Sequence, residues 1–251
     1  MIWASSNGHR CRPRPSTVAL SLALTLAACA SGPPVPDWQR QGPAALDRAV
    51  AAYLGGDGRI AQAEFDRAWL ELSRSGRTDL LARAALLRCA AQVASLDTSP
   101  CTGFEPLRAD AAAAELASAD YLAGRAMPAT WALLPPAQQT VAAAAGGAAD
   151  AALAAISDPV SRLVAAGVLL QTGRASPVTV ALAVDTASAQ GWRRPLLAWL
   201  GVMAQRADAA GAVDEAARLR RRIAWVQGGA AGSLASPTST STSTSTPTPA
   251  P

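Results

Sequence analysis

Carboxylates and cysteines are the side chains through which this chain could do chemistry. It contains 18 Asp and Glu residues and four cysteines, but its only histidine is His9 and it has no lysine. Carboxylates can catalyse glycoside hydrolysis when two of them converge in a cleft. Here several are spaced for ion pairs on a helix surface, as in Asp79 with Arg83 and Asp214 with Arg218. We therefore predict no catalytic residue.

The first 28 residues have the order of a secretory signal. A basic region without an acid (Arg10, Arg12 and Arg14) precedes an apolar run from Val18 to Ala28. The run ends in small residues, as a cleavage site requires. It is shorter than the roughly 20 apolar residues that span a membrane. We therefore predict that residues 1–28 are a signal peptide that is removed.

The end of this segment, Leu26-Ala27-Ala28-Cys29, resembles the lipobox of bacterial lipoproteins. The resemblance implies cleavage before Cys29 and lipidation of its sulfur, so that acyl chains hold the protein to a membrane lipid. An ordinary secretory signal followed by a coincidental cysteine is the alternative. Ala30 stands where lipoproteins of the inner membrane typically carry Asp. The resemblance therefore favours an anchor in the outer membrane, with the protein facing the periplasm.

Loss of the signal changes the charge and the chemistry of the chain. The formal net charge of +4 includes the three arginines of the signal, and 19 arginines and 18 acids remain without them. A nearly neutral chain argues against a nucleic-acid partner, which would require a basic face. Because His9 is lost as well, the commonest general base and any Ser-His or Cys-His pair are missing. We predict that the protein is not an enzyme and that it uses no cofactor.

Cys89 and Cys101 remain once Cys11 and Cys29 are assigned to the signal and the lipid. In an oxidising compartment they have one possible intramolecular pairing, and two unpaired thiols are the alternative. Two cysteines without histidine are poor zinc ligands, so we predict no metal site. We predict a disulfide that stabilises the fold by roughly 3 kcal/mol. The bridged loop would form a rigid surface feature with Phe104 as its apolar element.

The segment from 43 to 228 has the composition and punctuation of an all-α domain. Alanine accounts for 62 of the 251 residues, and it favours helices over strands. Asp158-Pro159 and Ser176-Pro177 place a capping side chain before a proline at the first helical position. The predicted helices lie near 43–54, 58–74, 78–96, 105–123, 136–145, 148–156, 158–172, 177–190, 194–209 and 211–226.

Two segments flank this domain. Residues 29–42 carry the lipidated cysteine and are rich in proline, which predicts an extended tether. Residues 229–251 are dominated by Ser, Thr and Pro. Such a tail buries too little apolar surface to offset the entropy of ordering, so we predict that it is disordered.

The first helix pair resembles a tetratricopeptide repeat. Its signature of small, glycine, small, aromatic and small residues is carried by Ala49, Gly56, Ala61, Phe65 and Ala68. The same spacing recurs with Arg220 in place of the aromatic residue in Ala204, Gly211, Ala216, Arg220 and Ile223. Around Gly173, Ala166 and Leu182 fit the spacing, whereas Val178 and Asp185 do not. The resemblance implies antiparallel helix pairs in a tetratricopeptide-like solenoid, and an irregular helical array is the alternative.

Trp192, Arg193 and Arg194 place an aromatic ring and two guanidinium groups at a predicted helix start. They could contact an anionic or aromatic group of a partner. The alternative is a tryptophan that packs at the helix entry beside two exposed arginines.

These observations predict a membrane-anchored lipoprotein that faces the periplasm and acts as a non-catalytic helical interaction or scaffold module in the cell envelope. Its concave face would hold an extended segment or a helix of an envelope protein. One alternative is a cell-wall or carbohydrate hydrolase with two converging carboxylates. Another is a carrier of a small ligand in an apolar cavity between helices.

Overall fold

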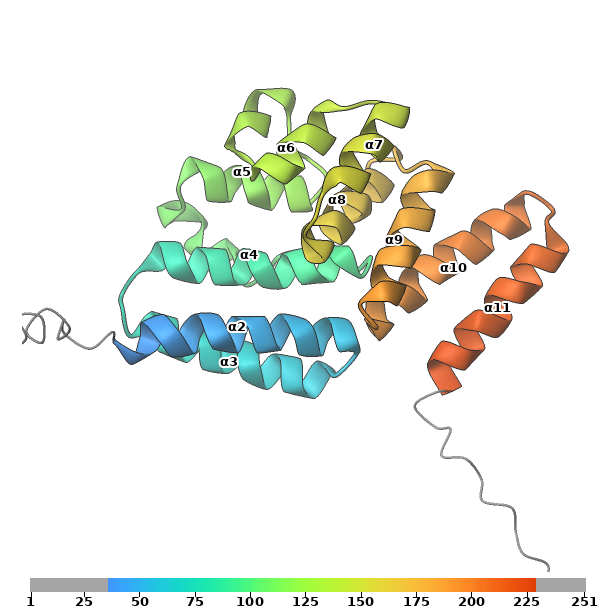
Figure 1. Cartoon of the computed structure of the whole chain (residues 1–251). Coiled ribbons are helices and arrows are strands. Elements are labelled where there is room, and N and C mark those ends of the chain that lie inside the picture. Colours follow the sequence, from blue (N-terminus) through green and yellow to red (C-terminus); the bar gives the residue numbers. More distant parts are fainter. Residues whose placement is uncertain (1–35, 229–251) are drawn as a thin grey trace, which may run out of the picture.

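Helices make up every regular element in the part of the chain that the computed structural model describes, residues 36–228 (Figure 1). This confirms the predicted all-α array. Cys29, the predicted signal and the predicted tail lie outside the described residues. The α-helices are α2 (Asp37–Gly55), α3 (Gly58–Ser73), α4 (Thr78–Ala94), α5 (Ala113–Leu122), α6 (Pro136–Ala143), α7 (Gly147–Ala155), α8 (Pro159–Gln171), α9 (Pro177–Ala189), α10 (Arg193–Ala209) and α11 (Val213–Gly228), and the 3-10 helices are η1 (Glu105–Asp110) and η2 (Pro128–Leu133).

The start of α2 corrects the predicted boundary between tether and domain. The helix begins at Asp37, six residues before the predicted start, so residues 37–42 are helical. Pro43, at the predicted start of the domain, lies inside α2. Asp37 in the first turn favours this earlier start, because a negative charge there complements the helix dipole.

The segment around residues 105–135 departs from the predicted helices in two ways. The predicted helix over 105–123 is two elements, η1 and α5, because Ala111 and Ala112 adopt extended backbone between them. The short helix η2, which begins at Pro128, was not predicted. Six residues carry too little periodic signal to indicate a helix.

The first helix pair packs through the residues that carry the repeat resemblance. Ala49, Ala61 and Ala68 are at most 3% exposed, and the Phe65 ring is also buried. Gly56 ends α2 with a φ of 103°, a left-handed conformation that favours glycine. As a result, α2 and α3 lie side by side as a hairpin (Figure 1).

The last helix pair uses the same spacing with a different contact. Ala204 and Ala216 are buried between α10 and α11, and Gly211 turns the chain in the left-handed conformation. Arg220 occupies the aromatic position and forms an exposed ion pair with Asp208 of α10. In the hairpin of α8 and α9, Val178 is exposed, so that position does not contribute to packing.

Contacts between helices that are distant in sequence distinguish this array from a regular solenoid, in which each repeat contacts only its neighbours. Helix α8 packs on α4, and α10 reaches both α2 and the end of α4. At the first of these contacts, a Cβ added to Gly167 would lie 2.5 Å from the carbonyl oxygen of Val93. At the second, the buried Trp199 Nε1 donates to the Ala94 carbonyl oxygen at 3.1 Å.

Cys89 and Cys101 form the predicted disulfide, with their Cα atoms 5.7 Å apart. It joins α4 to the loop that leads into η1. The expectation for Phe104 was wrong, because its ring is fully buried in the core and is not a surface element. The disulfide therefore fixes the loop that carries a core residue.

Candidate functional site

A groove between α2, α4, α5 and α8 is the candidate site in the described part of the chain. It has a volume of about 810 Å³ and is open to solvent. We call it the central groove. It is lined by Asp47, Val50, Ala51, Arg83, Leu86, Leu87, Ala90, Ala114, Glu115, Ser118, Tyr121, Leu122, Leu133, Leu134, Pro135, Gln138, Asp158, Val160, Ser161, Val164 and Trp192.

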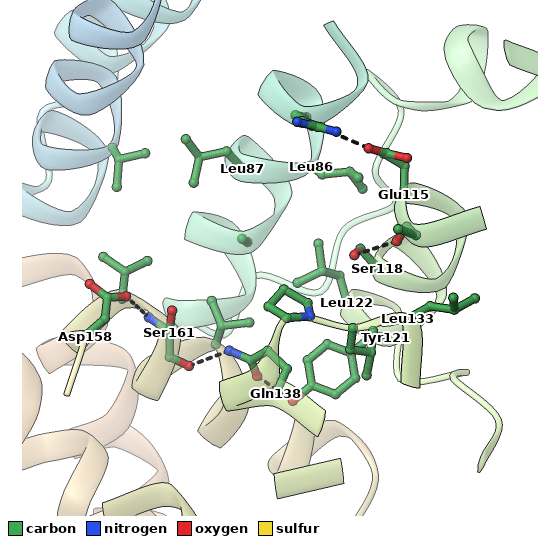
Figure 2. A pocket seen from close by; sticks show the side chains of 18 of the residues that line it. Leu86, Leu87, Glu115, Ser118, Tyr121, Leu122, Leu133, Gln138, Asp158 and Ser161 are labelled. Atoms are coloured by element: carbon green, nitrogen blue, oxygen red, sulfur yellow. Dashed lines mark hydrogen bonds and ion pairs between the residues drawn. The ribbon is translucent and has the colours of Figure 1, made fainter. Parts of the chain in front are cut away.

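The floor of the central groove is apolar because two helices present one face to it. On α4, Leu86 and Ala90 are four residues apart and share a face, with Leu87 beside them. On α5, the lining positions from Glu115 to Leu122 also recur at helical spacing. In Figure 2, Leu86 and Leu122 lie between the ribbons of α4 and α5, and Leu87 lies on the side of α4 that faces α2. The surface can therefore cover apolar side chains of an occupant.

A chain of hydrogen bonds connects α5, α6 and α8 along one wall of the groove. The Tyr121 hydroxyl donates to Gln138 Oε1 at 2.7 Å, and Gln138 Nε2 donates to the Ser161 carbonyl oxygen at 3.0 Å (Figure 2). Burial raises the pKa of the Tyr121 hydroxyl, so this group remains a donor. Because the network connects α5, α6 and α8, it holds the wall in one arrangement.

Two of the acids that line the groove are Glu115, on α5, and Asp158, at the start of α8. Asp158 Oδ2 accepts from the Ser161 backbone N–H at 2.7 Å and so caps α8, as the sequence predicts. Glu115 is buried, and its Oε1 accepts from Arg83 Nε at 3.0 Å. Glu115 Oε2 has no hydrogen-bond partner among the described residues. A buried acceptor left unpaired costs about 1–3 kcal/mol, so a donor that reaches it is favoured.

Two of the three acids that line the groove have structural roles. Asp158 caps a helix, and Glu115 is paired with an arginine. Within residues 36–228, no group of three or more His, Cys, Asp or Glu side chains is arranged to hold a metal ion. The groove thus combines an apolar lining with carboxylate acceptors and the Arg83 guanidinium.

The structure brings one of the three predicted contact residues to the groove. Trp192 lines its edge and precedes α10, whereas Arg193 and Arg194 turn toward the end of α2. Arg194 Nε donates to the Tyr53 carbonyl oxygen at 2.7 Å, and its guanidinium lies 4.3 Å from the centre of the Tyr53 ring. Neither sequence interpretation expected this intramolecular contact, which joins α10 to α2.

Sequence reasoning missed Glu115, Tyr121 and Gln138 as groove residues. They lie on two helices of an alanine-rich segment, and their contacts depend on how these helices pack. The available signal was that Glu115 lies seven residues, or two helical turns, before Leu122 and so shares its side of α5.

None of the helices between residues 36 and 228 is long and apolar enough to cross a membrane. Comparison of the chain with protein-family models, with curated proteins and with solved structures finds no match. The function is therefore inferred from the geometry of the central groove.

Proposed function

We propose that this protein is a non-catalytic binding module of the bacterial cell envelope, and that its central groove holds an apolar segment of a protein partner. The observation that supports this proposal is the apolar lining of an open groove, in which the partly exposed Leu87 and the exposed Leu133 lie beside the buried Leu86 and Leu122. Its volume falls within the roughly 300–1,000 Å³ of typical binding sites. Grooves between helices also suit an amphipathic helix laid in with its apolar face down.

The tether belongs to the same proposal. Lipidation of Cys29 would anchor the chain to a membrane that faces the periplasm, with the outer membrane favoured by Ala30. Residues 30–36 separate the anchor from α2, and seven residues reach at most about 25 Å when extended. The groove would therefore be presented close to a lipid surface, where a partner in the envelope is concentrated.

Two other functions from the sequence receive less support. A small-ligand carrier would agree with the volume, but an enclosed cavity would suit it better than an open groove. A hydrolase would need two carboxylates free to act, whereas Glu115 is paired and Asp158 caps a helix, so that of the three lining acids only Asp47 has no such role. A binding module needs only the apolar floor.

A model peptide tests groove binding directly. The peptide is helical, carries one stripe of leucines and otherwise glutamine and alanine, and bears a fluorophore for anisotropy. Ala51 is an exposed residue of the groove wall on α2, so Ala51→Trp would fill the space and weaken binding by about tenfold or more. The control is Ala151→Trp, at an exposed position of α7 outside the groove. Equal affinities for the two variants would refute the groove as the site.

The anchor has its own test. Metabolic labelling with a fatty-acid analogue would mark the wild-type chain and leave Cys29→Ala unlabelled. Equal labelling of both chains would remove Cys29 from the proposal.

A further inference from the structure

Negative charge gathers at the central groove although the helical domain is nearly neutral. Residues 36–228 contain 19 arginines and 18 acids. The groove instead is lined by three acids, Asp47, Glu115 and Asp158, and by one arginine, Arg83. Figure 2 shows Asp158 and Glu115 on opposite sides of the floor, with Leu86 and Leu87 between them. An occupant therefore meets acids on both sides of an apolar strip.

Arg83 offsets this charge only in part. Its side chain is 65% exposed, whereas that of its partner Glu115 is 7% exposed. Water screens the arginine more strongly than the buried carboxylate, so the carboxylate has the larger effect on a group inside the groove. Glu115 Oε2, which has no partner among the described residues, can still accept a hydrogen bond.

Asp47 supplies charge on the α2 side. It is exposed on the face that also carries Val50 and Ala51. The adjacent Arg48 does not neutralise it, because Arg48 pairs with Glu64 of α3 at 2.8 Å. At the other end, Asp158 uses one oxygen to cap α8. Carboxylate oxygens thus remain at both edges of the groove to pair with an occupant.

Resting on the proposed function, we propose that the partner segment is a basic amphipathic helix. Its apolar face covers the floor of Leu86, Leu87 and Leu122, and lysine or arginine residues on its flanks reach the acids at the edges. Negative potential over a low-dielectric floor attracts such a segment and rejects an acidic one. The charge pattern therefore sets which apolar segments the groove accepts.

The test compares three peptides of equal length that share one leucine stripe and carry lysine, glutamine or glutamate on its flanks. Two ion pairs that are exposed or half-buried together contribute about 1.4 kcal/mol to the free energy of binding. This corresponds to about tenfold in affinity. We expect the lysine peptide to bind the full chain about tenfold more tightly than the glutamine peptide, and the glutamate peptide to bind most weakly. The preference should shrink at about 1 M salt, where the Debye length is about 3 Å.

A double variant, Asp47→Asn with Asp158→Asn, assigns the preference to the groove. Asparagine caps a helix as well as aspartate does, so α8 keeps its first turn. We expect the variant to lose most of its preference for the lysine peptide over the glutamine peptide and to retain only the share that Glu115 contributes. The matched control, Asp185→Asn with Asp214→Asn, removes two exposed acids from α9 and α11 and should retain the preference.

The outcomes separate the two proposals. If all three peptides bind equally and Ala51→Trp weakens each, the charge inference is overturned while groove binding stands. If no peptide binds, the proposed function is overturned with it. If an alkyltrimethylammonium ion binds and no peptide does, the occupant is a small organic cation, and the inference of a helical partner is overturned.

Discussion

At the scale of single residues, three arginines bind the carbonyl groups at helix ends. Arg162 donates to the Ile156 carbonyl oxygen after α7, and Arg174 donates to carbonyl oxygens at the end of α6. Arg194 does the same at Tyr53, near the end of α2. The last carbonyl groups of a helix lack intrahelical partners, and a cation there also complements the helix dipole. Arginine suits this role because its planar fork of donors reaches several acceptors.

Arg194 provides a prediction at this scale. Arg194→Ala removes a charged hydrogen bond and a ring contact from the junction of α10 and α2, which we expect to lower the free energy of unfolding by about 1–3 kcal/mol. Urea denaturation measures it. Arg221→Ala, which removes an exposed arginine of α11, should change the stability by less than about 0.5 kcal/mol. Equal effects of the two substitutions would remove the junction from the account.

Asp97 makes the same region sensitive to acid. Hydrogen bonds from Ser99 lower the pKa of this carboxyl, and the Tyr53 hydroxyl donates to it at 3.4 Å. A lowered folded-state pKa contributes stability above the unfolded value of about 3.9, and this contribution is lost as the pH falls through the folded pKa. We expect Asp97→Asn to reduce the fall in the free energy of unfolding at low pH, measured by denaturation at a series of pH values. An unchanged fall at low pH would contradict the role of Asp97.

At the scale of elements, the sequence predicts helices better than it predicts their meeting points. Glycines and caps such as Ser176 and Asp158 are local, so most helix bounds follow from a few adjacent residues. The residues that line the groove are spread along the chain from α2 to Trp192, which precedes α10. No local sequence pattern indicates that these distant residues meet. Asp158 illustrates the difference, since its capping role was predicted and its place in the groove was not.

Gly167 is the clearest such meeting point. Alanine is favoured over glycine in a helix by about 1 kcal/mol, but a Cβ at Gly167 would lie 2.5 Å from the Val93 carbonyl oxygen. We therefore expect Gly167→Ala to destabilise the protein by about 1–3 kcal/mol, because α8 must move off α4. Gly201 of α10 has nothing within 4 Å of an added Cβ. Gly201→Ala should thus be stabilising in the same thermal melts, and a stabilising effect at both positions would refute the close contact.

At the scale of the whole molecule, α4 connects the core, the disulfide and the groove. It carries Cys89, packs on α8 and contributes Leu86 and Leu87 to the floor. The sequence predicts the disulfide because cysteine counting is independent of folding. It could not indicate that the bridged loop brings Phe104 into the core, because burial depends on every helix around the ring.

The disulfide therefore contributes to stability without forming the site. Replacement of Cys89 by Ala together with Cys101 by Ser should lower the free energy of unfolding by about 3 kcal/mol, since the unfolded chain regains the entropy of the open loop. Peptide affinity measured well below the melting temperature should stay within about twofold of wild type. Loss of binding in the folded variant would show that the loop shapes the groove.

The central claim is that the groove is the surface through which this protein holds its partner. Position-specific photocrosslinking in the cells that produce the protein tests it, with a benzophenone amino acid placed at Leu133 or at Leu70. Both side chains are exposed, 43% and 57% respectively, but Leu133 lies at the groove and Leu70 lies on α3, outside the groove lining. We expect the probe at Leu133 to yield adducts that map by mass spectrometry to one apolar, basic segment of a partner, and the probe at Leu70 not to do so. Adducts to the same segment from both positions, or from Leu70 alone, would contradict it.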